Sequence, residues 1–147
     1  MKLLFDFSVW IEHLRNGVLH AVVPVLRGKL VLWMDGVVAA ELLAGCRGRQ
    51  DERAVTRLIA PFERAGRMAV ATYPDYERAA AALSRLRSRG RTLSSPGGAL
   101  LDALIGSVGV RIGAMVVTTK LRDFEALVAQ MPLVVEPFDR FAVRFAH

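Results

Sequence analysis

Four acidic residues stand out because each lies within or shortly after an apolar run. Asp6 directly follows LLF, and Asp123 follows AMVV and the turn 118–122. Glu41 is the only charged residue in VVAAELLAG, and Asp102 is the only one in GALLDALIGSVGV. Because a lone carboxylate is costly to bury, such residues are usually paired or bound to a metal.

Each acid also has a simpler interpretation. Asp6 could cap the helix that follows it, with Ser8 as an alternative cap, and Asp123 could cap a helix that begins at FEALVAQ. Glu41 and Asp102 could lie on exposed helix faces, although few polar residues share the helix of Asp102. The residue types alone leave these alternatives open.

Four clustered carboxylates would repel one another and raise each other's pKa, and a divalent cation removes that conflict. An all-oxygen set favours Mg²⁺ or Mn²⁺ over zinc. The three histidines are scattered, and the single cysteine excludes a multi-cysteine zinc site. A metal of this kind supports phosphodiester hydrolysis by activating a water and stabilising charge on the phosphate.

Other catalytic signatures are missing from the sequence. It contains no G-x-x-x-x-G-K-[ST] phosphate loop, no G-x-G-x-x-G after a strand and no G-x-S-x-G elbow. Gly106, Gly109 and Gly113 are interpreted as sites of close packing and as a helix end. The carboxylates therefore remain the strongest catalytic candidates.

Apolar runs typical of buried strands alternate with segments typical of helices. Strands are expected at Lys2–Phe5, Leu30–Leu32, Met68–Ala71, Ala114–Val117 and Leu133–Val135. Helices are expected at Ser8–Arg15, Leu19–Leu26, Ala39–Ala44, Asp51–Ala60 (stopped near Pro61), Pro74–Arg89, Ala99–Arg111 and Phe124–Ala129. This alternation predicts an α/β fold with a mostly parallel sheet, whose sites form at the carboxyl ends of the strands.

The 147 residues suit one domain with one core. The most apolar stretch, Val18–Gly45, is interrupted by Pro24, Arg27, Lys29 and Asp35, which argues against a spanning helix. We therefore expect a soluble protein without a targeting segment.

The chain is basic, with a formal net charge of +6 and a pI of about 10.4. Such a surface favours nucleic acid or another polyanion. Four arginines crowd one segment, at positions 85, 87, 89 and 91. They could complement a helix end or contact an RNA backbone, and the sequence does not decide between the two.

Three segments carry a family resemblance: LLFDFSVWIEHLRNG, VVAAELLAG and LLDALIGSVGVRIGAMVVTTKLRDFEAL. Their order and spacing resemble those of PIN-domain ribonucleases of the VapC toxin type, across nearly the whole chain. The resemblance implies one PIN domain over residues 1–147, folded as a three-layer α/β/α sandwich.

The resemblance also implies roles for individual residues. The four acids would bind Mg²⁺ or Mn²⁺ and activate a water that cleaves RNA: Asp6, Glu41, Asp102 and Asp123. Ser8 falls on a hydroxyl position that supports the first aspartate or its metal ligands, and Thr118 would orient the acids.

Lys120 departs from the family pattern, because many relatives carry Asn or Asp at this place. Its charge could contact phosphate, neutralise part of the site or weaken binding of a second metal. A PIN-like module that binds RNA or protein without cutting is therefore an alternative, and a DNA-directed metal nuclease is a third hypothesis.

Proteins of the VapC type are usually cytoplasmic toxins that a small VapB-like antitoxin neutralises, and many form homodimers. The resemblance implies these partners and this location for the present chain.

Overall fold

The computed structural model describes residues 1–20, 30–93 and 96–145. Five strands form one sheet in the order β3-β2-β1-β4-β5, and every neighbouring pair is parallel. The strands are β1 (Lys2–Phe5), β2 (Val31–Asp35), β3 (Met68–Ala69), β4 (Ala114–Thr118) and β5 (Val134–Pro137). The predicted α/β fold is confirmed, and its sheet is parallel throughout.

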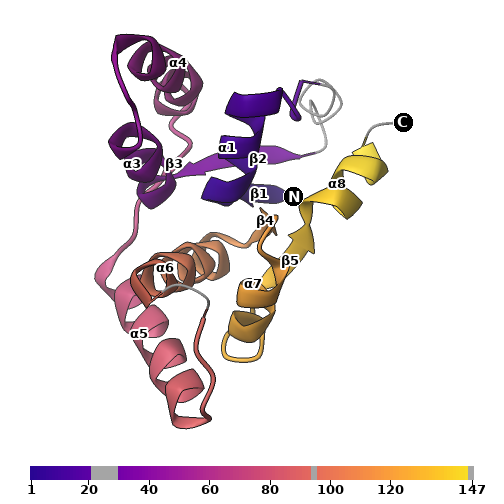
Figure 1. Cartoon of the computed structure of the whole chain (residues 1–147). Helices are drawn as coiled ribbons and strands as arrows, with labels where there is room; N and C mark the ends of the chain where they lie inside the picture. Colours follow the sequence, from indigo (N-terminus) through magenta and orange to yellow (C-terminus); the bar gives the residue numbers. More distant parts are fainter. Residues whose placement is uncertain (21–29, 94–95, 146–147) are drawn as a thin grey trace.

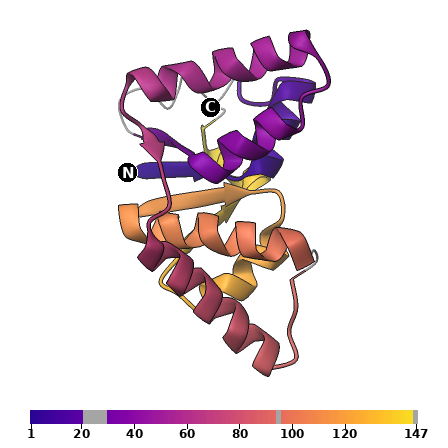
Figure 2. The ribbon, with the colours of Figure 1, turned by 90° about the vertical axis from the view of Figure 1, so that its left-hand side faces the viewer.

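Seven helices lie within the described residues. They are α1 (Phe7–Asn16), α3 (Gly36–Ala44), α4 (Arg49–Arg64), α5 (Tyr73–Ser88), α6 (Pro96–Ile112), α7 (Leu121–Val128) and α8 (Phe138–Phe145). Figure 1 shows the helices arranged around the central strands. In Figure 2, α3 and α4 lie on one side of the strands, and α5 and α6 lie on the other. This arrangement leaves β1 as the buried centre of the sheet, with Leu3, Leu4 and Phe5 all inaccessible to solvent.

Two helices differ from the prediction, and a third predicted helix is not tested. The helix expected to stop near Pro61 runs on to Arg64, because the Pro61 carbonyl still accepts from Ala65 N at 3.0 Å while Ile59 anchors the helix in the core. Helix α8 was not predicted; eight residues form a marginal helix alone, and the buried Phe141 holds it against the sheet. The helix expected at Leu19–Leu26 falls mainly on residues outside the described ranges.

Helix α6 packs closely against β4 and the residue before β5 at two of its glycines, Gly106 and Gly109. A Cβ on Gly106 would come within 3.0 Å of Leu133, and one on Gly109 would come within 3.1 Å of Val116. Gly113 ends the helix with a positive φ of 68°. The packing and helix-end interpretation of these glycines is confirmed.

Within the described part of the chain, no helix is both long enough and apolar enough to span a bilayer.

Candidate active site

The strand order reverses between β1 and β4, and the first candidate aspartate lies at that point. The register pairs Phe5 with Val117, and Asp6 N donates to the Val117 carbonyl at 3.0 Å. Asp6 therefore leaves β1 beside Thr118, at the carboxyl edge of the sheet. Ligands of open parallel sheets bind in the crevice that forms at this kind of reversal.

Two hydroxyl groups hold the Asp6 carboxylate. Ser8 Oγ and Thr118 Oγ1 each donate to Asp6 Oδ2 at 2.8 Å. The other oxygen, Oδ1, is buried and accepts no hydrogen bond from any residue within the described ranges. Asp6 occupies the N-cap position of α1, but its side chain makes no capping hydrogen bond. The interpretation of this carboxylate as a helix cap is therefore wrong.

The same hydroxyls fix the turn after β4. Thr119 N donates to Ser8 Oγ at 3.1 Å, and Lys120 N donates to Thr118 Oγ1 at 2.9 Å. Each hydroxyl thus bridges the Asp6 carboxylate to a backbone amide of the turn. The network fixes the starting point of the Lys120 side chain relative to Asp6.

Asp102 lies on α6 and is only 5% exposed, so the interpretation of an exposed helix face is wrong. Lys120 Nζ donates to both of its oxygens, at 3.0 and 3.1 Å. Burial raises the Asp102 pKa to about 6; Lys120 opposes this shift, and the negative charges of Asp6 and Asp123 add to it. The carboxylate is thus paired but still short of compensating positive charge.

Glu41 lies half-buried on α3, a helix that contacts α6. Burial raises its pKa, and the negative charges of Asp6 and Asp102 raise it further. An exposed helix face does not explain a carboxylate that feels two buried ones, so this interpretation is not supported.

Asp123 is buried inside α7, and the N-cap position of that helix belongs to Lys120. The helix-cap interpretation of Asp123 is therefore wrong. Its charge acts on both Asp102 and Lys120. The structure thus brings all four predicted acids into one electrostatically coupled region, although they come from four separate segments of the chain.

The donors of this region suit a hard divalent cation. They are carboxylate oxygens, and the buried Asp6 Oδ1 still has full capacity to accept a cation. In the present side-chain positions, no three Asp, Glu, His or Cys residues among those described are close enough to share a metal ion. Binding of a metal ion by several of these acids would therefore require side-chain movement.

Two buried aspartates were not singled out from the sequence. Asp35 is the last residue of β2, whereas Asp6 directly follows β1, and burial raises the Asp35 pKa to about 6. Asp75 belongs to the pattern Thr72-x-x-Asp75, which is typical of a capping box at the start of a helix. The sequence contained a signal for each residue: Asp35 lies at the end of an apolar strand, and Asp75 has the spacing of a capping box.

The arginine-rich segment is partly explained by packing. Arg85 Nε donates to Gln130 Oε1 at 3.0 Å, and one of its terminal nitrogens donates to the Gln130 carbonyl at 2.8 Å. These bonds tie the end of α5 to Gln130, which lies just beyond the end of α7. Arg87, Arg89 and Arg91 remain exposed, so an RNA contact by these three stays a prediction.

A profile of the PIN domain family matches residues 3–129, which is most of the chain. No curated protein sequence matches this chain.

Solved structures of the same fold match nearly the full length. The chain is similar to VapBC-1 from nontypeable Haemophilus influenzae, with 19% identity, coverage of 95% of this chain and 99% of that one, and a TM-score of 0.68. It is similar to VapBC2 from Rickettsia felis, solved with a DNA fragment from its promoter, with 14% identity, 93% and 98% coverage, and a TM-score of 0.70. A third is VapBC-5 from Mycobacterium tuberculosis, of the VapBC family of toxin–antitoxin systems, with 18% identity, 92% and 96% coverage, and a TM-score of 0.59. At these identities the likeness establishes the fold alone.

Proposed function

The chain belongs to the PIN-domain family, and from that premise we propose that it is a Mg²⁺- or Mn²⁺-dependent endoribonuclease acting as the toxin of a VapBC pair. The observation that carries the proposal is the buried Asp6 at the reversal of the strand order, whose Oδ1 accepts no hydrogen bond from the described residues and whose charge acts on Glu41 and Asp102, with Asp123 acting on Asp102. PIN domains are typically nucleases.

Asp6, Glu41, Asp102 and Asp123 would hold the metal ion. When bound, the ion would supply an activated water and stabilise the charge that develops on the phosphate and the leaving oxygen. Ser8 and Thr118 keep the Asp6 carboxylate in one orientation through their hydrogen bonds to Oδ2. This arrangement leaves Oδ1 as the oxygen available to a cation.

The partners follow from the same family assignment. We propose RNA as substrate, a VapB-like antitoxin as the neutralising partner, and a homodimer in the cytoplasm. We also propose that residues 1–147 form a single PIN domain. The formal net charge of +6 and the similarity to structures of VapBC proteins support the first two partners.

Substitution of the two most deeply placed acids tests the proposal. Asp6→Asn and Asp102→Asn should each reduce Mg²⁺-dependent RNA cleavage by about 100-fold or more, since each removes charge from the metal site. Cleavage of RNA and DNA should be measured in parallel, because faster DNA cleavage would favour the DNA-nuclease hypothesis. Circular dichroism should show that the variants remain folded.

Glu125→Gln is a matched control. It removes an exposed carboxylate from α7, the same helix that carries Asp123, and should leave cleavage unchanged. Cleavage by Asp6→Asn at the wild-type rate would show that the site assignment is wrong.

A PIN-like module that binds RNA or protein without cutting is the second candidate. The observation that favours it is the Lys120 ammonium group, which engages both oxygens of Asp102 where a metal would bind. Calorimetric titration of the metal-free protein with Mn²⁺ separates the two functions. Heat of binding that disappears in Asp6→Asn supports the nuclease, whereas no binding to the wild-type protein supports the module.

A further inference from the structure

We propose that the Lys120 ammonium group takes the place of one divalent cation, so that the site binds one metal ion where the carboxylates alone would bind two. This inference rests on the metal site of the proposed function. It concerns the number of ions, which the family assignment does not fix.

The position of the ammonium group is the first argument. Lys120 Nζ lies 3.0 and 3.1 Å from the two oxygens of Asp102 and therefore uses the carboxylate symmetrically, as a bound cation would. The Asp102 side chain is 8% exposed and the Lys120 side chain 41%, so the lysine reaches inward from the surface. It therefore lies between Asp102 and solvent.

The anchoring of Lys120 is the second argument. Its backbone amide donates to Thr118 Oγ1, which in turn donates to Asp6 Oδ2. The lysine thus begins at a point fixed relative to Asp6 and ends on Asp102. The hydrogen-bond network that orients the first aspartate also positions the ammonium group.

The balance of charge is the third argument. The charges of Asp6, Asp102 and Asp123 all act on Lys120, and both Asp6 and Asp102 act on Glu41. One divalent ion together with the ammonium group would cancel three of the four negative charges. Two divalent ions beside the lysine would leave a net positive site, and each ion would be repelled by the ammonium group. Two ions balance the four acids only when the lysine charge is removed.

Counting bound Mn²⁺ tests this inference directly. The metal-free protein would be titrated with Mn²⁺, and free Mn²⁺ would be measured by electron paramagnetic resonance. We expect one bound ion per wild-type chain and two per chain of Lys120→Gln, which keeps a polar side chain but removes the charge. Lys120→Arg keeps the charge and should bind one ion.

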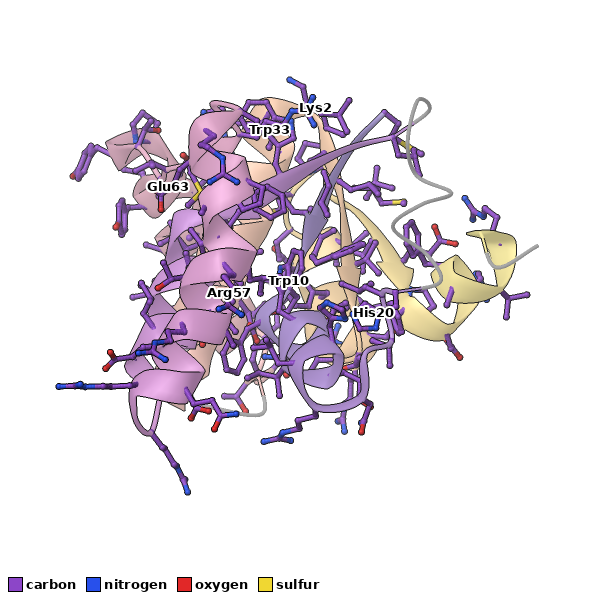
Figure 3. All side chains as sticks on the ribbon, turned by 90° about the horizontal axis from the view of Figure 1, so that it is seen from above. Lys2, Trp10, His20, Trp33, Arg57 and Glu63 are labelled. Atoms are coloured by element: carbon purple, nitrogen blue, oxygen red, sulfur yellow. The ribbon has the colours of Figure 1, made fainter. Side chains whose placement is uncertain are left out.

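Lys2→Gln controls for the loss of one positive charge elsewhere. Lys2 begins β1, at the end of the strand opposite Asp6, and its Nζ lies 5.4 Å from the centre of the Trp33 ring. Figure 3 shows the two side chains together. This variant should bind the same number of ions as the wild type.

The count decides between the outcomes. Equal numbers of ions in the wild type and Lys120→Gln, including none in both, overturn the inference. One ion in both leaves the proposed function intact. No ion in the wild type and one in Lys120→Gln also overturns the inference, which requires one ion beside the lysine, and it removes the metal from the proposed function. If Lys120→Gln does not fold, Lys120→Ala is judged by the same count.

Discussion

Two buried aspartates, one on α5 and one on the packed helix α6, differ in how fully positively charged partners and hydrogen-bond donors compensate their negative charge. Asp75 accepts from Thr72 N at 2.8 Å, Thr72 Oγ1 at 3.0 Å and Arg111 Nε at 2.8 Å, with Arg78 at 3.4 Å. Asp102 is held by Lys120 alone among the hydrogen bonds described for it. Burial acts to raise the pKa of both, yet the bonds to Asp75 bring its pKa below the ordinary value, while that of Asp102 rises to about 6.

The contrast separates a structural carboxylate from a candidate functional one. Asp75 has enough donors to be stable as an anion, so its charge strengthens the junction between α5 and α6. Asp102 is an anion that its surroundings do not fully compensate, and other carboxylates lie nearby. A buried negative charge without full compensation is more typical of a functional site that binds a cation than of a carboxylate with a purely structural role.

The largest effect should come from Asp75→Ala. Removing one partner of a buried ion pair destabilises a protein strongly, and the two arginines remain about one-third exposed and can regain water. We therefore expect a loss of about 3 kcal/mol in the free energy of unfolding, at the lower end for buried pairs. Urea denaturation at neutral pH without metal would measure it.

Asp102→Asn tests the other aspartate of this comparison. The free energy of unfolding of this variant should change by less than about 1 kcal/mol. The Lys120 side chain can turn to solvent, and the buried, incompletely compensated charge of Asp102 is removed. The comparison would fail if Asp102→Asn proved as destabilising as Asp75→Ala.

Asp35 extends the comparison to a third buried aspartate, which lies near enough to feel the charges of Asp75 and Arg111. Burial raises its pKa from 3.8 to about 6, so the folded protein binds a proton that the unfolded chain releases between these values. The contribution of Asp35 to the free energy of unfolding is therefore highest at low pH and is lost as the pH rises through 6. Asp35→Asn should gain about 2 kcal/mol relative to wild type between pH 4.5 and 7.

The measurement is thermal or urea unfolding of both proteins at several pH values. Asparagine keeps an acceptor for the Val37 amide, which Asp35 Oδ1 now accepts at 2.7 Å, so the cap is retained. A stability difference that stays constant across this range would contradict the raised pKa.

Thr118→Val should have a moderate effect, and it falls on activity. It removes the hydroxyl that donates to Asp6 and accepts from Lys120 N, while keeping the shape of the side chain. We expect kcat/KM for RNA to fall about ten-fold, which corresponds to about 1.4 kcal/mol. Thr118→Ser restores the hydroxyl and should recover most of the activity. Loss of activity without recovery in the serine variant would indicate a packing role for this threonine.

The sequence predicts the sheet well because its strands are short apolar runs separated by clear helix signals. It also selects Asp6 and Asp102, since a charge beside or within an apolar run is conspicuous. The sequence alone does not exclude that Asp6 and Asp123 cap helices, because this depends on which donors contact each carboxylate in the folded protein. The pairing of Lys120 with Asp102 was equally hidden, because it joins residues 18 apart through a turn whose geometry hydroxyl groups determine.

The bond between Thr118 and Asp6 spans 112 residues of sequence, and it joins the strands on either side of the reversal. As the chain emerges during synthesis, Asp6 is made early, but its partner on β4 follows only when most of the polypeptide exists. Contacts of such long sequence separation form late in folding. A nascent or truncated chain that ends just before β4 contains Asp6, Glu41 and Asp102 but lacks Thr118, Lys120 and Asp123, so the site is assembled only in a nearly complete chain.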